Sequence, residues 1–211
     1  MKRAHLIVDL DGVVQEPVLS HIVNWGMEKD DRGRRNVPPI EILAAIVEYK
    51  LGHISAKQMA ALAPFFAEGG RHVLIPYLPR AVYALKELVK LYSGRVHICS
   101  NTSYDENADD MYVERLESDF GRGAFADIML LPFTASKEDY FKEVAREADG
   151  GRVIVLDDSL RKCRQAERAD CEPILVGGKP AKGMDHAREL YEFMLMSSLH
   201  MNAKGRAYGD E

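Results

Sequence analysis

Two aspartates near the start of the chain have the type and spacing of a catalytic pair. An apolar run over residues 5–8 leads directly into Asp9 and, two residues later, Asp11. Side chains two residues apart on a strand point to the same side, so these carboxyl groups are expected to share one small space. Two anions so close are unfavourable unless a cation lies between them or one carboxyl group is protonated. Both conditions describe a catalytic site better than a structural one.

The rest of the chain predicts a parallel sheet that would position this pair. Five apolar runs are expected to form strands, at residues 5–9, 95–99, 127–131, 153–156 and 173–176. Apolar residues at helical spacing predict intervening helices, at residues 78–92, 109–120, 137–148 and 159–169. Such alternation is typical of right-handed crossovers and a parallel sheet. The strands are rich in Val, Ile and Leu, which fits an α/β sheet covered on both faces.

A long segment between the first two strands interrupts this alternation with helices. Pro38 and Pro39 open an apolar stripe, and Ser55 with Gln58 has the form of a capping box at the start of a second helix. We therefore expect residues 15–77 to form a helical insertion over the carboxyl end of the sheet.

The remaining chain is assigned to a core and a tail. Residues 1–14 and 78–200 are expected to form the α/β core, with a last helix over roughly residues 185–199. Residues 201–211 are polar and contain glycine, so a flexible tail is predicted there.

Composition restricts the class of protein. The 211 residues are 46% hydrophobic and 29% charged, as in an ordinary globular protein, and the net charge of -5 disfavours a nucleic-acid partner. No apolar run approaches the roughly 20 residues of a membrane helix, so no membrane partner is expected. The 3 cysteines have no CxxC spacing and are expected to be reduced, as in a cytoplasmic protein. The 7 histidines form no zinc-binding pattern, and the oligomeric state is undetermined.

Further polar residues stand at strand ends and helix starts, where ligands bind in open α/β sheets. Ser100 and Asn101 follow the second predicted strand, and Asp157 with Asp158 follows the fourth. Lys137 lies near the start of the helix before that fourth strand. Each group alone has a plainer interpretation, as a turn, a helix cap or a surface lysine. Their order along the chain, together with the first aspartate pair, favours one site.

This set of residues resembles the motifs of the haloacid dehalogenase superfamily, whose members are mostly magnesium-dependent phosphatases. The segment from Asp9 to Val13 is similar to the first motif, Ser100 to the second, Lys137 to the third and Asp157-Asp158 to the fourth. The resemblance implies a Rossmann-like core with a five-stranded parallel sheet in the order 5-4-1-2-3. It also implies that the helical insertion is a cap over the site.

The resemblance implies a role for each residue of the first motif. Asp9 would be the nucleophile that becomes an aspartyl phosphate, and Asp11 would be the general acid and base. Mg²⁺ would be held by Asp9, the main-chain carbonyl of Asp11 and Asp158, with Asp157 as a further ligand or holding a metal-bound water.

The other motifs would bind phosphate. Ser100, Asn101 and Lys137 are the expected phosphate-binding residues, and Ser100 and Lys137 would also stabilise the transferred group. Lys137 is followed by Glu138 where relatives commonly have proline, so Lys142 is kept as a second candidate.

These roles imply a hydrolase, a phosphatase that acts on a small phosphorylated metabolite. Two alternatives stay open from the sequence: a phosphotransferase or mutase of the same superfamily, and a non-catalytic regulatory protein that keeps the fold. Dehalogenation is disfavoured, because dehalogenases of the superfamily lack the second carboxylate that Asp11 provides here.

Overall fold

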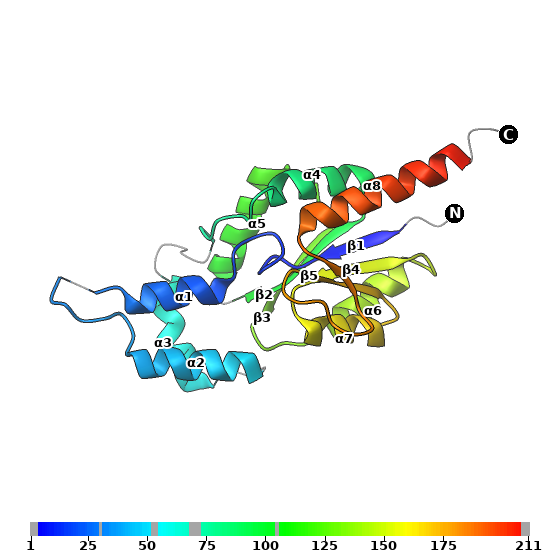
Figure 1. Ribbon diagram of the computed structural model, residues 1–211. Helices are drawn as coiled ribbons and strands as arrows, with labels where there is room; N and C mark the ends of the chain where they lie inside the picture. The colour runs from blue at the N-terminus through cyan, green and yellow to red at the C-terminus, as the bar shows by residue number, and fades with distance from the viewer. Residues whose placement is uncertain (1–3, 30, 52–54, 68–72, 104–105, 208–211) are drawn as a thin grey trace.

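One parallel sheet organises the larger part of the molecule (Figure 1). The computed structural model describes residues 4–29, 31–51, 55–67, 73–103 and 106–207. The sheet has six strands in the order β3-β2-β1-β4-β5-β6. Their bounds are β1 His5–Val8, β2 Val96–Ser103, β3 Asp127–Pro132, β4 Val153–Asp157, β5 Glu172–Val176 and β6 Asp185–Ala187. All neighbouring strands are parallel, which confirms the predicted α/β class and the order of the five predicted strands.

A sixth strand corrects the prediction of a five-stranded sheet. Strand β6 pairs with the edge of β5, with Ile174 beside Asp185, in a region that was predicted to be helical. A strand of three residues is too short to show a period of two, so the sequence carries no strand signal there. Helix α8 begins only at Leu190 and continues to Ala207, so most of the predicted tail is helical, while residues 208–211 lie outside the described ranges.

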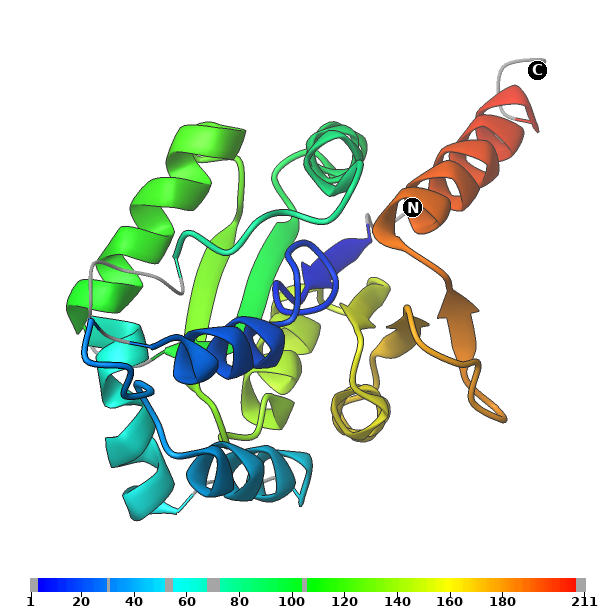
Figure 2. The same ribbon diagram turned by 60° about the vertical axis from the view of Figure 1, so that its left-hand side comes forward.

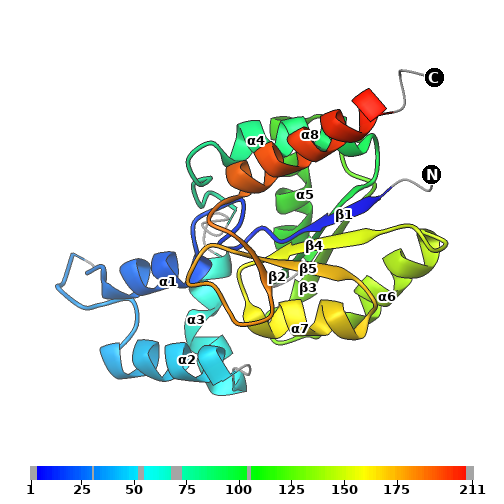
Figure 3. The same ribbon diagram turned by 45° about the vertical axis from the view of Figure 1, so that its right-hand side comes forward.

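Helices cover both faces of the sheet, as predicted (Figure 3). Leu6 and Val8 of β1 face one apolar cluster, to which helices α4 (Ala81–Tyr92), α5 (Glu106–Phe120) and α8 contribute. Ile7 faces the other cluster, built with α6 (Glu138–Glu147) and α7 (Leu160–Arg168). Alternate residues of β1 thus bury their side chains on opposite faces, which explains the uninterrupted apolar run.

The helical insertion has an apolar core of its own, and we call residues 15–77 the cap. Its helices are α1 Val18–Met27, α2 Pro39–Leu51 and α3 Ala56–Ala67, and they pack mainly on one another. Trp25 of α1 contacts Phe65 of α3 with ring centroids 5.7 Å apart. The Ser55 hydroxyl accepts a hydrogen bond from the Gln58 main-chain N–H at 3.4 Å, half of the predicted capping box. The cap lies beyond the carboxyl ends of the strands (Figures 1 and 2).

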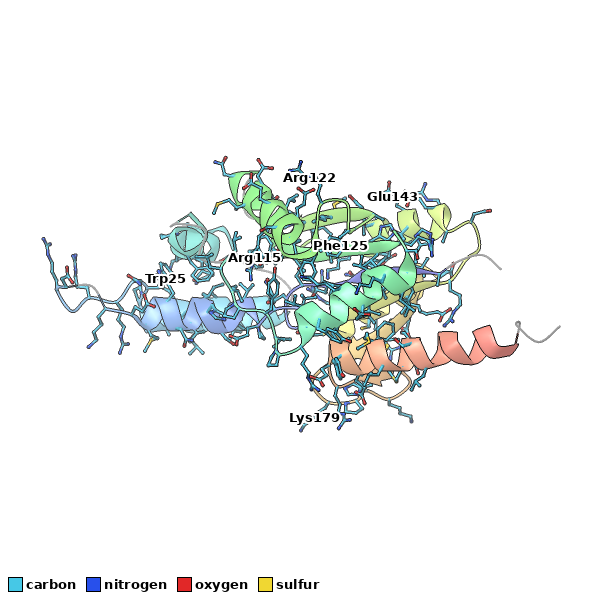
Figure 4. All side chains as sticks on the ribbon, turned by 90° about the horizontal axis from the view of Figure 1, so that it is seen from above. Trp25, Arg115, Arg122, Phe125, Glu143 and Lys179 are labelled. Atoms are coloured by element: carbon cyan, nitrogen blue, oxygen red, sulfur yellow. The ribbon has the colours of Figure 1, made fainter. Side chains whose placement is uncertain are left out.

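Two adjacent chain segments, residues 14–16 and 76–78, join the cap to the core, and we call them the hinge. Gln15 and Tyr77 form an antiparallel bridge, and the Leu78 N–H donates to the Val14 carbonyl at 2.9 Å. Arg115 of α5 braces the returning segment, since its guanidinium donates to the carbonyl of Ile75 at 2.9 Å and lies 4.2 Å from the Tyr77 ring centroid. Figure 4 shows Arg115 on α5, between the cap that carries Trp25 and the core.

No helix within the described ranges has both the length and the apolar character needed to span a membrane.

Candidate active site

Lys137 lies at the centre of a buried ionic cluster. Its ammonium nitrogen is 3.0 Å from Asp9 Oδ1 and 2.7 Å from Asp157 Oδ2, and the side chain is 2% exposed. The two aspartates lie at the carboxyl ends of neighbouring strands, because β1 pairs with β4 in parallel and the Asp9 N–H donates to the Leu156 carbonyl. Lys142 instead lies on the surface, paired with Glu138, so the structure places Lys137 in the cluster and not Lys142.

The carboxylates keep Lys137 charged. Burial on its own disfavours the ammonium, but Asp157 and Asp9 outweigh it, and the pKa of Lys137 lies above its ordinary value. Asp157 is itself held on both oxygens, since Oδ1 accepts the Ser159 N–H at 2.9 Å and Oδ2 binds Lys137. Asp157 therefore orients the lysine.

Asp11 points toward the cap. Its Oδ1 accepts a hydrogen bond from the main-chain N–H of Val18, the first residue of α1, at 2.5 Å. Pro17 at the N-cap position makes no side-chain cap, so Asp11 satisfies this free helix donor. Burial raises the pKa of Asp11 to about 7, against the opposing effect of the Val18 hydrogen bond, and the Asp9 charge adds to the rise. Asp11 can thus exchange a proton near neutral pH.

Asp158 lies at the rim of the cluster, against the backbone of Gly12. Gly12 has φ +75°, and a Cβ placed on it would come within 2.3 Å of Asp158 Oδ2. Only glycine fits this close approach. Desolvation of its carboxyl group raises the pKa of Asp158 to about 8, and the charges of Asp9, Asp157 and Asp11 act in the same direction.

The acidic groups fit a divalent cation. Ligand oxygens of Asp9, Asp157 and Asp158 all lie within 4.8 Å of one another. Asp11 brings a fourth carboxyl group to this cluster, and the charges of the neighbouring aspartates add to the desolvation that raises the pKa of Asp11 and of Asp158. Carboxylate oxygens are the ligands that Mg²⁺ prefers. Because both oxygens of Asp157 are engaged, Asp9 and Asp158 are the better placed to hold the ion.

Ser100 offers an unused donor beside this cluster. The side chain is fully buried on β2, and its hydroxyl has no hydrogen-bond partner among the described residues; the same is true of the hydroxyl of Thr102. A buried hydroxyl without a partner is costly, which is expected where a ligand supplies the missing contact.

Asn101 makes a different contact from the one predicted. Its side-chain NH₂ group donates to the carbonyls of Pro132 at 2.7 Å and Ala135 at 3.1 Å. Both amide hydrogens are therefore used within the protein, and none is left for phosphate. The structure gives the Asn101 side chain the task of holding the segment between β3 and α6.

Three buried polar residues of the site had not been found from the sequence. Lys162 of α7 is 5% exposed, and its ammonium donates to the Ala135 carbonyl at 2.6 Å. Gln165 of the same helix is 8% exposed, and its side-chain oxygen accepts the Lys137 N–H at 3.0 Å. Burial lowers the pKa of Lys162 to about 8, and the Lys137 charge adds to this effect. Gln15 is 1% exposed and donates to the Tyr112 hydroxyl at 2.6 Å. The available signal was a polar side chain at an apolar position, such as Gln15 directly after Val13-Val14.

Comparisons with known proteins identify the fold. No family model and no curated protein matches the chain. Several solved structures do match. A D,D-heptose 1,7-bisphosphate phosphatase from B. bronchiseptica, complexed with magnesium and phosphate, has a TM-score of 0.58 at 16% identity, over 94% of this chain and 99% of that one. A haloacid dehalogenase-like hydrolase from Streptococcus pneumoniae has a TM-score of 0.60 at 15% identity, over 92% and 97% of the two chains.

A third similar structure is an L-2-haloacid dehalogenase from Xanthobacter autotrophicus, with a TM-score of 0.58 at 12% identity, over 94% of this chain and 99% of that one. The fold is therefore common to enzymes with different chemistry, and the site residues must decide between them. The chain therefore has the fold of the haloacid dehalogenase superfamily, the fold that the resemblance of its motifs implied.

Proposed function

We propose that this protein is a Mg²⁺-dependent phosphatase that hydrolyses a small phosphorylated metabolite through an aspartyl phosphate on Asp9. The observation that carries the proposal is the contrast between two aspartates two residues apart. Asp9 is ion-paired with Lys137, whereas Asp11 is turned toward α1 and has a pKa of about 7. Two carboxyl groups whose environments differ in this way suit a nucleophile and a proton-transfer group. A phosphatase with bound magnesium and phosphate among the similar structures supports this assignment.

The reaction would proceed in two displacements. An Asp9 oxygen attacks phosphorus, the bond from phosphorus to the ester oxygen breaks, and protonated Asp11 gives its proton to the leaving alkoxide. Asp11, now ionised, takes a proton from the water that attacks the aspartyl phosphate, and inorganic phosphate leaves. Near neutral pH both forms of Asp11 are accessible, so one residue can serve both steps.

The remaining residues would stabilise the transferred group. Ser100 Oγ has no partner in the part of the chain that the structure describes and would donate to a phosphate oxygen, while the Lys137 ammonium would neutralise charge on Asp9 and on the phosphate. Asp9, Asp158 and the main-chain carbonyl of Asp11 would hold Mg²⁺, which when bound supplies positive charge to the phosphate oxygens.

Asp11 also bears on the dehalogenase alternative, since several similar structures are dehalogenases. Breaking a carbon–halogen bond releases a halide ion that needs no proton, so that step does not need a second carboxyl group as an acid. A phosphate ester releases an alkoxide that does need one. Asp11 therefore favours phosphate chemistry. The phosphotransferase alternative differs only in the acceptor of the phosphoryl group.

Phosphate release from p-nitrophenyl phosphate tests the proposal. We expect turnover with Mg²⁺, none with excess EDTA, and none for Asp9→Asn with Mg²⁺. Asp110→Asn removes an exposed aspartate of α5 and should keep wild-type turnover. Beryllium fluoride, which mimics the aspartyl phosphate, should stabilise the wild type and not Asp9→Asn. Folded wild-type protein that neither turns over nor responds to beryllium fluoride would refute the proposal and favour the regulatory alternative.

A further inference from the structure

The position of the cap over the site depends on few contacts. Helices α1, α2 and α3 pack mainly on one another, so the cap is a unit with its own apolar core. The two hinge segments run side by side, joined by the Gln15–Tyr77 bridge and by the hydrogen bond from the Glu16 N–H to the Pro76 carbonyl. Neighbouring attachment points define an axis but not the angle of the cap about it. A further contact away from the hinge is needed to fix that angle.

Phe133 supplies such a contact. It lies in the segment after β3, which runs next to the cap in Figures 1 and 2. Its half-buried side chain packs against the apolar cluster of the cap, which includes Val18, Ile22 and Phe65. Among the described residues beyond the hinge, Phe133 is the one side chain that belongs to this cluster. The contact is therefore made by a core residue inserted among cap residues.

The core holds the backbone on both sides of Phe133. Asn101 donates to the carbonyls of Pro132 and Ala135, and Lys162 donates to the same Ala135 carbonyl. The Ala135 N–H in turn donates to the Pro132 carbonyl at 2.9 Å. Two polar side chains of the core, one of them buried, thus fix the short turn that presents Phe133. A turn held by these hydrogen bonds is suited to support the cap.

The same segment ends at the catalytic lysine. Lys137 follows Phe133 by four residues, and its own N–H is fixed by Gln165. One rigid segment therefore carries both the contact with the cap and the cation that binds Asp9. The position of the cap relative to Asp9 is therefore set through this one segment of the core.

We propose that Phe133 is a positioning residue that fixes the angle of the cap over Asp9 and Asp11. Its side chain is an apolar support for the cap away from the hinge, and the Asn101 and Lys162 hydrogen bonds hold that support in place. The effect on turnover rests on the proposed phosphatase function. The effect on the cap itself does not, because it follows from packing alone.

Hydrogen exchange tests the packing. In Phe133→Ala we expect amides of α1 to exchange about tenfold faster than in the wild type, with amides of β1 and β4 unchanged. Phe133→Leu keeps an apolar side chain and should restore most of the protection. Thr134→Ala changes the exposed neighbouring residue and should match the wild type. Unchanged exchange in α1, or equal acceleration in α1, β1 and β4, would overturn the proposal.

Kinetics with p-nitrophenyl phosphate and Mg²⁺ tests the consequence for catalysis. Phe133→Ala should lower kcat about tenfold, and Phe133→Leu should recover it. Orthovanadate would bind to the core residues Ser100 and Lys137, so its inhibition of Phe133→Ala should stay as in the wild type. Weaker vanadate inhibition would mean that the core site itself is damaged, which contradicts a role through the cap. If wild-type protein shows no turnover, the phosphatase proposal fails, and hydrogen exchange still decides the role of Phe133.

Discussion

Replacing Gly12 by alanine tests whether the close approach of Asp158 to the backbone serves a metal ion. An alanine at φ +75° costs about 1–2 kcal/mol in backbone strain. Its Cβ would also come within 2.3 Å of Asp158 Oδ2, roughly 1 Å short of ordinary contact, so the carboxylate must move by about that much. Mg²⁺ requires oxygen distances near 2.0–2.1 Å and near-ideal geometry, so a shift of this size should weaken binding at least tenfold.

Gly33 provides a matched control for the backbone cost. It also has φ +75°, and a Cβ placed on it meets nothing within 4 Å. Gly33→Ala should therefore lose a similar 1–2 kcal/mol of unfolding free energy, and it should bind Mg²⁺ as the wild type does.

The assay is urea unfolding at increasing Mg²⁺. A ligand at 100 times its dissociation constant stabilises the folded state by about 2.7 kcal/mol, and tenfold weaker binding removes about 1.3 kcal/mol of this. Gly12→Ala should thus show less Mg²⁺-dependent stabilisation than Gly33→Ala, together with loss of phosphatase turnover. Equal stabilisation of the two variants by Mg²⁺ would refute the reasoning that Asp158 holds the ion against Gly12.

Two further predictions concern buried charge. Lys137→Met leaves Asp9 and Asp157 buried without their cation, so we expect a loss of about 3–5 kcal/mol of unfolding free energy and no turnover. The control Lys142→Met changes an exposed lysine and should lose less than about 0.5 kcal/mol. Similar losses in the two variants would contradict this prediction. Burial, with the nearby His5 charge, lowers the pKa of His97 from 6.5 to about 4. Neutral His97 therefore contributes fully to the free energy of unfolding above pH 6.5, and this contribution is lost as the pH falls toward 4. Urea unfolding should show a loss on the order of 2 kcal/mol over this range that His97→Gln reduces, and an unchanged slope in His97→Gln would exclude His97 as its source.

Local sequence patterns predicted most of the sheet and the acidic part of the site. Strand β4 is a continuous apolar run that ends at Asp157-Asp158, so both its existence and the place of its carboxylates could be predicted. The choice of Lys137 over Lys142 could be stated but not proved, because burial of one lysine and exposure of the other depend on how α6 rests on the sheet.

Contacts between segments distant in sequence could not be predicted. Asn101 follows a strand as a phosphate ligand would, and only the folded chain shows that the carbonyls of Pro132 and Ala135 use its amide hydrogens. Lys162 was overlooked because a lysine on an amphipathic helix is ordinarily a surface residue. Its ammonium donates to a carbonyl 27 residues away in the sequence, and no local pattern reports such a contact.

The geometry of the hinge would allow the cap to be replaced without a change in the core. Val14 and Leu78 are joined by a main-chain hydrogen bond, so the chain leaves the core and returns to it at nearly the same point. Among the described residues, the two apolar clusters that flank the sheet contain none from α1, α2 or α3, so these helices are not part of the packing of the core. A lineage could therefore lengthen, shorten or replace the cap while the sheet and its charged residues stayed as they are.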